Sequence, residues 1–469
     1  MARDLKPFFA PRSIAVVGAS ERPTSSGGAV LQNLRFAGFA GEIIPVNPKG
    51  GTMFGMAARK SLSELERPAE LAVIVIRPDL IVDAVREAAA TGHRNLVILP
   101  GGFAEAGEVG LARDTALRAL IAEKALTVVG PNCAGIIHLP SDARFAATFL
   151  RDLPLGPNRH GMATFITQSG ALGEEAIAAS KSLTVPLGSL VSVGNAVQLG
   201  VTDYLEYLGA QRSISVVLLY VESVEDESRF RRVAQQVAAQ KPVVALIGGR
   251  TPAGAAAARR HTGAPAQDEH RIETLCRDGC LLRVKSLRQL LLAAKGFGSF
   301  PQGIGKRALI LSNSGGPGVL CADEAAAQGL DLPELPAAMA ATLRADLPGE
   351  AAVANPLDLL ADAREERFGL TLQAAIRDGA AAFDVILGIH VVPFMVDATP
   401  VVARMAALAP SVPVPFLYSM MGTLPEKAAW FAAMEGAGVP VFNDVEAMAE
   451  CAGLLARYPA LKARAASAA

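Results

Sequence analysis

The chain has 469 residues, more than one ordinary hydrophobic core organises, so about three domains of 100 to 200 residues are expected. Its 44 basic and 45 acidic side chains leave a net charge of −1, and it holds one Trp and five Tyr, which argues against a nucleic-acid partner. The apolar residues come in short runs broken by Gly, Pro or charge, and Pro7 and Pro11 interrupt the start of the chain. We therefore expect no membrane segment or export signal, and a cytoplasmic location.

The five cysteines stand at positions 133, 276, 280, 321 and 451, without paired CxxC spacing. Cys276 and Cys280 would give at most two ligands on one helical face, which is fewer than a zinc site uses. We expect free thiols and no bound metal.

Residues 1–150 alternate short apolar runs with helix-like segments. The runs are continuous and rich in β-branched residues, which is typical of strands in a parallel sheet covered on both faces. They lie at 13–17, 42–47, 71–76, 95–99 and 126–130. A doubly wound α/β domain is predicted. Its first strand runs into Gly18, Ala19 and Ser20, and the next helix is expected to begin near Gly27 and Gly28. This arrangement resembles a nucleotide-phosphate loop without matching a strict GxGxxG.

Two Pro- and Gly-rich stretches, at 153–158 and 296–305, are predicted to be linkers. Further strands are predicted at 163–167, 187–193, 214–221 and 242–247, and then at 307–311, 384–392, 412–418 and 439–442. All three units are therefore predicted to be α/β, with domains at 1–150, 151–300 and 301–469.

His261 stands in a small, cationic stretch that runs from Gly248 to Ala264. A neutral imidazole is a good nucleophile near pH 7, because its unperturbed pKa of about 6.5 leaves a large neutral fraction. If the ring accepts a phosphoryl group, the new anion needs cations and hydrogen-bond donors. The candidates nearby are Arg250, Arg259, Arg260, Thr262 and the Gly263 amide. The alternative is a solvated loop histidine beside two arginines.

Two segments, 165–173 and 310–318, share one pattern of strand, polar pair, Ser-Gly and helix. Small residues let the backbone amides of such a turn point at a ligand, and the helix N-terminus adds about half a positive charge. Each segment alone suits an ordinary strand-to-helix turn. The matched pair favours two phosphate sites, as a mobile phosphohistidine would need at both ends of its travel.

Short motifs follow one another in a fixed order from about residue 7 to about residue 450. They are SIAVVGAS at 13–20, IPVNPK at 44–49, GFAEAG at 102–107, VGPNCAG at 129–135, QSGALG at 168–173, SVGN at 192–195, DYLEYL at 203–208, GRT at 249–251, HTGA at 261–264, SGGPG at 314–318 and NPLDL at 355–359. Through these motifs the chain resembles the ADP-forming (NDP-forming) acyl-CoA synthetases, typified by ADP-forming acetate-CoA ligase and more distantly by succinyl-CoA synthetase. The resemblance implies an α subunit: a Rossmann-like CoA-binding domain followed by two flavodoxin-like, succinyl-CoA synthetase-like domains with parallel sheets.

The resemblance also implies roles for single residues. His261 would carry the phosphoryl group, and Glu222 would accept one imidazole N–H, which fixes the tautomer and leaves the other nitrogen free to attack phosphorus. The CoA-binding residues would be Gly18, Ala19, Ser20, Lys49, Gly101, Gly102 and Asn132. Phosphate would be held by Gln168, Ser169, Gly170, Thr262, Gly263, Ser314, Gly315 and Gly316. Standing alone, Lys49 and Glu222 would each be taken for solvated residues. Cys133 is expected to be a small buried thiol beside the acyl site, not a nucleophile.

The family's reaction interconverts acid, CoA and ATP with acyl-CoA, ADP and phosphate through an acyl phosphate and a phosphohistidine. The sequence shows no Walker A motif and no segment long enough for an ATP-grasp domain. The resemblance therefore implies a separate ATP-grasp β subunit with Mg²⁺, in an α2β2 heterotetramer. The implied ligands are coenzyme A, a small carboxylic acid and, through the partner, ATP or ADP.

Two other functions stay open. A catalytically reduced CoA-sensing or acyl-CoA-sensing module would keep the fold, although the retention of His261 and Glu222 counts against it. A nicotinamide-dependent oxidoreductase would need an acidic residue after the second strand, where Lys49 and its neighbours stand instead. The family's usual His-Thr-Gly-Ala-Leu-Ala-Gly reads His-Thr-Gly-Ala-Pro-Ala-Gln here, which affects the expected rate and acyl specificity more than the reaction type.

Overall fold

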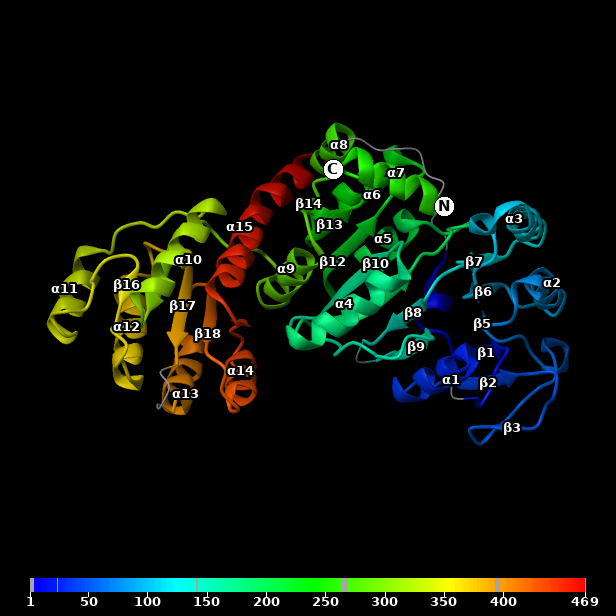
Figure 1. Ribbon diagram of the computed structural model, residues 1–469, viewed down its shortest axis with the longest axis horizontal. Helices are drawn as coiled ribbons and strands as arrows, with labels where there is room; N and C mark the ends of the chain where they lie inside the picture. Colours follow the sequence, from blue (N-terminus) through cyan, green and yellow to red (C-terminus); the bar gives the residue numbers. More distant parts are fainter. Residues whose placement is uncertain (1–3, 23, 141, 263–268, 393–396, 469) are drawn as a thin grey trace. The chain divides into compact units, whose positions relative to one another are not determined.

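The structure is a computed structural model and describes residues 4–22, 24–140, 142–262, 269–392 and 397–468; for residues 259–262 it describes the backbone alone. The chain forms two compact units. Unit 1 comprises Met1–Ala294 with Arg464–Ala469, and unit 2 comprises Lys295–Ala463. The predicted α/β architecture is confirmed, because the described residues form sheets of five, seven and five strands flanked by helices (Figure 1).

The first sheet, in unit 1, is parallel throughout. Its order is β2 (Glu42–Val46), β1 (Ser13–Val17), β5 (Leu71–Ile74), β6 (Asn95–Ile98) and β7 (Thr127–Val129). Side chains alternate between its faces: Ile14 and Val16 share a core with α1 (Ser26–Phe36), whereas Ala15 shares one with α2 (Ile81–Ala90) and α3 (Gly107–Glu123). Helices thus cover both faces, as the unbroken apolar runs predict. A small hairpin of β3 (Thr52–Met53) and β4 (Met56–Ala57) follows β2.

The second sheet, also in unit 1, has seven strands. Their order is β14 (Leu282–Val284), β13 (Val243–Ile247), β12 (Ile214–Val221), β10 (Met162–Thr167), β11 (Leu187–Ser192), β8 (Gly135–His138) and β9 (Phe145–Thr148). The accompanying helices are α4 (Gly170–Ser182), α5 (Val201–Gly209), α6 (Glu227–Ala238), α7 (Pro252–Thr262), α8 (Glu269–Asp278) and most of α9 (Leu287–Ser299). The first five strands in this order are parallel, and β8 and β9 add an antiparallel edge.

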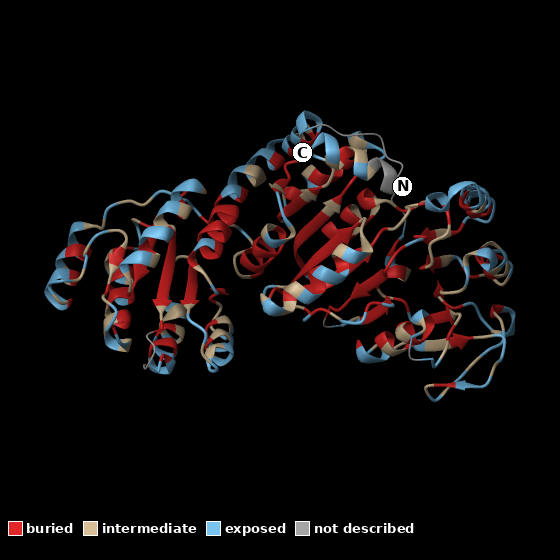
Figure 2. Cartoon of the chain, in the orientation of Figure 1, coloured by how far each residue is buried: buried red, intermediate tan, exposed pale blue. Residues whose placement is uncertain are grey.

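Strands β8 and β9 lie inside the range 1–150 that the sequence predicts to be one domain, yet they pair into the second sheet. The two sheets also share one apolar core, which includes Val129 of β7 and Ile136 of β8. Figure 2 shows most strands of both sheets as buried along most of their length. The boundaries at 150 and 300 stay a prediction.

Polar groups join the two sheets beside the shared core. The buried Asn33 of α1 donates from Nδ2 to the backbone oxygens of Thr148 and Leu150, at 2.8 Å each. At β7, the Gln198 side chain accepts from the Val128 amide and donates to the Leu126 oxygen, also at 2.8 Å each. Because buried polar groups cost free energy unless they are paired, these bonds fix how the two sheets pack.

Unit 2 holds the third sheet, which is parallel throughout. Its order is β16 (Leu357–Asp358), β15 (Ala308–Ser312), β17 (Val385–Val391), β18 (Phe416–Met421) and β19 (Val441–Phe442). Its helices are α10 (Gly315–Ala327), α11 (Ala337–Asp346), α12 (Glu365–Asp378), α13 (Thr399–Leu408), α14 (Lys427–Gly436) and most of α15 (Val445–Ala468).

The parallel strands of all three sheets follow one order. Counted along the chain, the second parallel strand of each sheet pairs with one side of the first strand, and the third pairs with the other side of the first strand. In such doubly wound sheets, ligands bind at the carboxyl ends of the strands where the order reverses, between the first and third strands. These positions follow β1 and β5, β10 and β12, and β15 and β17. Among the described residues, no helix is both long and apolar enough to cross a membrane.

The tight turn at Gly18 generates a first prediction. Its φ is +96°, and an added Cβ would lie 2.4 Å from the Val75 oxygen. We expect Gly18→Ala to lower the free energy of unfolding by more than about 3 kcal/mol, because backbone strain and a backbone clash add together. The matched control is Gly38→Ala, at a φ of +78° with nothing within 4 Å of the added Cβ, which should cost about 1 kcal/mol. Urea denaturation measures both, and equal losses would contradict the clash.

Buried His138 generates a second prediction. Its ring lies edge-on to Phe9 at 5.3 Å, and its Nδ1 lies 3.2 Å from Ser189 Oγ. Burial, opposed by Asp142, lowers the pKa of His138 from 6.5 to about 4. Between pH 6.5 and 4, His138 is protonated in the unfolded chain but neutral in the folded one. The free energy of unfolding that is present above pH 6.5 is therefore lost as the pH falls towards 4. We expect His138→Gln to flatten this decline, measured as unfolding free energy between pH 7 and 4.5; an unchanged slope would show that His138 is protonated in the fold.

Candidate functional site

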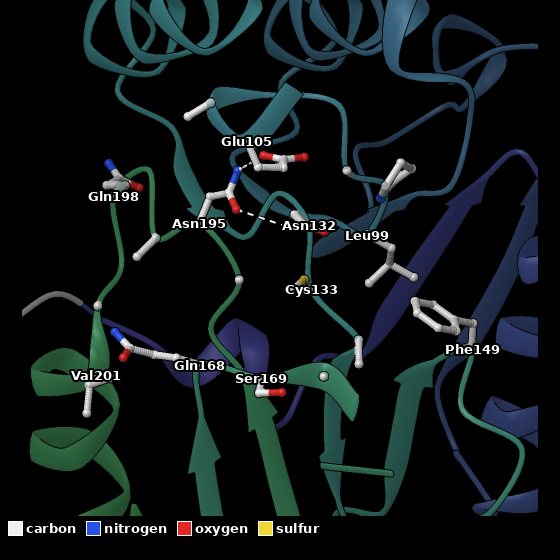
Figure 3. A pocket seen from close by; sticks show the side chains of 18 of the residues that line it. Leu99, Glu105, Asn132, Cys133, Phe149, Gln168, Ser169, Asn195, Gln198 and Val201 are labelled. Carbon is white, nitrogen blue, oxygen red and sulfur yellow. Dashed lines mark hydrogen bonds between the residues drawn. The ribbon is translucent and has the colours of Figure 1, made fainter. Parts of the chain in front are cut away.

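A cleft of about 2000 Å³ opens in unit 1 at the carboxyl ends of strands from both sheets (Figure 3). Loops after β1, β5, β6 and β7 line it from the first sheet, and loops after β10, β11 and β12 line it from the second. The predicted residues that line it are Gly18, Ser20, Gly101, Asn132, Gln168, Ser169 and Gly170. The cleft thus brings residues predicted for CoA binding together with residues predicted for phosphate binding.

The loop from β1 to α1 forms one wall. An added Cβ on Gly27 would lie 2.0 Å from the Gly18 oxygen, so the helix start packs directly on the turn. Ser25 caps α1 by accepting from the Gly28 amide at 3.1 Å. Gly27, where the sequence places the start of the helix, also lines the cleft. Four further lining residues near this loop were not singled out from the sequence: Arg22, Ser25, Ser26 and Arg77. Of these, Arg22 and Arg77 supply exposed positive charge, which sequence spacing alone did not mark.

Three predicted CoA residues do not line the cleft. Lys49 is exposed on the turn after β2, where its amide donates to Asn47 Oδ1 at 2.9 Å. Ala19 is buried, and its oxygen accepts from Asn47 Nδ2 at 2.8 Å. Gly102 is absent from the lining, but its amide donates to Glu105 Oε1. Ala19 and Gly102 therefore contribute to the shape of the loops, and Lys49 lies outside the cleft wall.

A hydrogen-bond network joins three loops across the cleft wall. Asn195, from the loop after β11, donates from Nδ2 to Glu105 Oε2 and accepts from Asn132 Nδ2 at 3.1 Å (Figure 3). Glu105 in turn accepts from the amides of Gly102 and Phe103. Sequence reasoning did not single out Glu105 and Asn195, although both stand inside the quoted GFAEAG and SVGN motifs.

Burial raises the pKa of Glu105, but the hydrogen bonds from Asn195 and from the backbone outweigh it and leave the pKa below its usual value. The carboxylate therefore stays ionised at neutral pH and accepts all of these donors. Because its partners come from both sheets, this one anion helps to keep the Asn132 loop in place against the second sheet.

Cys133 lies on the floor of the cleft beside an apolar wall that includes Leu99 and Phe149 (Figure 3). The thiol is buried and donates to the Ile98 oxygen at 3.4 Å. Burial raises its pKa to about 12, so it carries little thiolate at neutral pH. The structure thus agrees with a packed thiol. The five cysteines are all buried and form no disulfide, and the described residues hold no group of His, Cys, Asp and Glu arranged to bind a metal ion.

The N-terminus of α4 forms the opposite wall. Thr167 Oγ1 donates to the Ser169 oxygen at 2.9 Å and accepts from the Ser169 amide at 3.0 Å, while Ser169 Oγ accepts from the Leu172 amide at 3.3 Å. These bonds fix the turn so that α4 begins at Gly170 and points its positive end at the cleft.

Gln168 and Glu222 lie at the point where the strand order of the second sheet reverses. Gln168 Oε1 accepts from the amides of Glu222 and Ser223 at 2.6 and 3.2 Å, and its Nε2 donates to the Ser223 oxygen at 3.0 Å. Its side chain therefore fixes the end of β12. Glu222 is 8 % exposed and accepts from the Tyr220 hydroxyl at 2.9 Å. Glu222 does not itself line the cleft, but Ser223 and the next residues do.

His261 lies in the last turn of α7, at the end of a helix whose start is capped by Thr251. The side chains of Arg259, Arg260, His261 and Thr262, and all of Gly263, lie outside the described residues. Arg250 is exposed just before α7. The pairing of His261 with Glu222 therefore stays a prediction.

Unit 2 repeats the turn of α4 at the start of α10. Ser312 Oγ donates to the Ser314 oxygen at 2.7 Å and accepts from the Ser314 amide at 3.0 Å, as Thr167 does with Ser169. Asn313 accepts from the Val391 amide at 2.8 Å and donates to its oxygen at 2.9 Å, as Gln168 does at the end of β12. Gly315 and Gly316 are exposed at the start of α10. The structural repeat predicted from the two Ser-Gly segments is thus present, with its own phosphate role still a prediction.

Three domain families match the sequence. Residues 12–139 match the CoA binding domain, residues 160–297 the succinyl-CoA ligase like flavodoxin domain, and residues 308–465 the Ligase-CoA domain.

Whole-chain relatives agree with these domains. The alpha subunit of ADP-forming acetate–CoA ligase II from Pyrococcus furiosus is 33% identical over 452 residues, covering 95% of this chain and 96% of the relative. ADP-forming acetate–CoA ligase I from Archaeoglobus fulgidus is 34% identical over 377 residues, but these cover only 53% of its length. The chain thus spans nearly all of one relative and about half of another.

A solved structure extends the likeness to three dimensions. The dinucleotide forming acetyl-coenzyme A synthetase 1 of Ca. Korarchaeum cryptofilum, in complex with phosphate and ADP, aligns with a TM-score of 0.90 and 26% identity over 99% of both chains. A structure from Pyrococcus horikoshii aligns with a TM-score of 0.85 and 29% identity, covering 98% of this chain. Domains, sequence and structure therefore agree that the chain belongs to the ADP-forming acyl-CoA synthetases, a family of acid–thiol ligases.

Proposed function

We propose that this chain is the α subunit of an NDP-forming acyl-CoA synthetase that works through an acyl phosphate and a phosphohistidine at His261. The observation that carries the proposal is the cleft of unit 1, which joins the loops of the CoA-binding domain to the N-terminus of α4. A thioester held by the first sheet and a phosphate held at Gly170 would meet in this cleft.

Coenzyme A would enter along the first sheet. The close packing of Gly27 on Gly18 leaves room for its phosphates against the amides that start α1, and Arg22 and Arg77 supply cations on the same wall. Asn132 would lie beside the thioester, in a loop that Glu105 and Asn195 hold in place. The apolar wall of Leu99 and Phe149 would contact the acyl group of a small carboxylic acid.

Phosphate bound at the N-terminus of α4 would attack the thioester carbonyl, breaking the C–S bond and releasing CoA, which takes a proton. His261 would then attack phosphorus in the acyl phosphate, and the carboxylate would leave. Glu222 would accept the second imidazole N–H and stabilise the charged ring. The phosphohistidine would finally pass its phosphoryl group to ADP. The start of α10, where Gly315 and Gly316 are exposed beside the half-buried Ser314, would receive the group at the other end of its travel.

The nucleotide site would lie on a separate ATP-grasp β subunit that also brings Mg²⁺, in an α2β2 assembly. The support for this step is the Pyrococcus furiosus relative, which is named a subunit alpha and matches almost the full length of this chain. The Archaeoglobus fulgidus relative, of which this chain covers about half, would carry the remaining functions in one polypeptide.

The test is phosphoryl transfer to His261. Full-length chain is incubated with acetyl-CoA and radiolabelled phosphate, and separately with labelled ATP and a candidate β subunit. We expect an acid-labile, base-stable label that is absent from His261→Ala. Glu222→Gln should bind CoA normally but accept the label about 10- to 100-fold more slowly, because the imidazole tautomer is no longer fixed.

Calorimetric CoA binding is the control for each variant. Label that persists in His261→Ala would contradict the assignment of the carrier. CoA binding without any label, under either condition and with a range of acyl-CoA donors, would favour a CoA-sensing module instead.

A further inference from the structure

Tyr220 forms a pair with Glu222, and only the glutamate has a role in the mechanism proposed above. They stand two residues apart at the end of β12, so their side chains project from the same face. The Tyr220 hydroxyl donates to Glu222 Oε1 at 2.9 Å. Strand β12 is an inner strand between β10 and β13, so the backbone that carries the pair is held on both sides.

The tyrosine is a donor across the working pH range. Burial raises the pKa of Tyr220, and the adjacent Glu222 charge and the hydrogen bond raise it further. The phenol therefore keeps its proton, and an ionised carboxylate is the natural acceptor for it. Such a charge-assisted hydrogen bond restrains the torsions of the glutamate side chain and so fixes the direction in which the carboxylate points.

The segment that leads to His261 begins directly against this pair. The Gly248 amide donates to the Val221 oxygen at 2.9 Å as the chain leaves β13. A Cβ added at Gly248 would lie 3.1 Å from the Tyr220 hydroxyl and 3.4 Å from Glu222 Cγ. The chain then passes through Gly249 into α7, whose last turn holds His261.

Unit 2 provides an internal comparison. There Ser312 is paired with Ile389 on the next strand, as Thr167 is paired with Tyr220 in unit 1. Two residues further on, the Val391 amide donates to the Asn313 side chain and the Val391 oxygen accepts from it. In unit 1 the Glu222 amide and the Ser223 oxygen make the same two bonds with Gln168. Unit 2 thus keeps the turn and the amide bridge but has Ile389 and Val391 in place of the tyrosine and the glutamate. The fold therefore does not require the pair.

We propose that Tyr220 is a positioning residue for the phosphohistidine step: its hydroxyl holds the Glu222 carboxylate in the orientation that receives the His261 imidazole. This inference rests on the proposed function. It assigns to Gly248 the complementary role of leaving room for the hydroxyl where the His261 segment crosses the pair.

The test compares Tyr220→Phe with wild type in the labelling reaction with acetyl-CoA and radiolabelled phosphate, using the full chain. We expect the maximal rate of His261 labelling to fall about 10-fold, while the concentrations of acetyl-CoA and phosphate at half-maximal rate change less than about 2-fold. Gly248→Ala should lower the maximal rate in the same way. Tyr207→Phe, which removes a hydroxyl from a ring stacked on Phe9 at 4.9 Å, is the matched control and should label at the wild-type rate.

A double-mutant cycle separates positioning from general destabilisation. If the hydroxyl acts through the carboxylate, Tyr220→Phe combined with Glu222→Gln should label no more slowly than Glu222→Gln alone. If the double variant loses rate by the product of the two single losses, or if Tyr220→Phe labels at the wild-type rate, the role of Tyr220 is overturned. Either result would leave the phosphohistidine at His261 unaffected. Absence of label from His261 in the wild-type chain would instead overturn the proposed function, and this inference with it.

Discussion

The site depends on the packing of the first sheet against the second. One apolar core contains Val129 from β7 and Ile136 from β8, so strands of both sheets pack on either side of the Asn132 loop in the same core. Hydrogen bonds from the buried Asn33 and the half-buried Gln198 then fix the relative position of the sheets, because breaking them would leave backbone groups of the interior unpaired. The carboxyl ends of both sets of strands consequently open into one cleft, with no rearrangement needed to bring CoA loops and the α4 N-terminus together.

One strand order serves three sheets, but the ends of the strands differ in chemistry. In the first sheet the reversal of order leaves a glycine turn and a helix start; in the second it leaves Ser169 with Glu222 nearby; in the third it leaves Ser314 with Val391. The second and third share the same serine or threonine bridge across the turn. A common scaffold thus offers amide donors in two places. The glutamate that follows β12, Glu222, has no counterpart at the end of β17, where Val391 stands.

Sequence patterns predicted most of this architecture, since buried parallel strands appear as unbroken apolar runs: the segments predicted at 13–17 and 214–221 are β1 and β12. They did not predict β8 and β9, because such short segments become strands only when they pair with another strand. β8 pairs with β11, which follows about 50 residues later, and β9 pairs with β8. Glu105 and Asn195 were also missed, since a network between loops depends on how two sheets pack. Lys49 was placed in the CoA site by family likeness, yet its turn lies outside the cleft wall.

The hydrogen bonds of Gln198 also cover the open edge of the first sheet. β7 is the last strand of the first sheet, and a parallel edge strand presents unpaired amides and carbonyls to any other chain. Gln198 pairs with the Val128 amide and the Leu126 oxygen in the way that a neighbouring strand would, and Arg118 anchors the same loop through the Val197 oxygen at 2.8 Å. Parting the two sheets would therefore expose an aggregation-prone edge as well as the core. A ligand would therefore reach the cleft between the loops that line it, while the two sheets stay packed against each other.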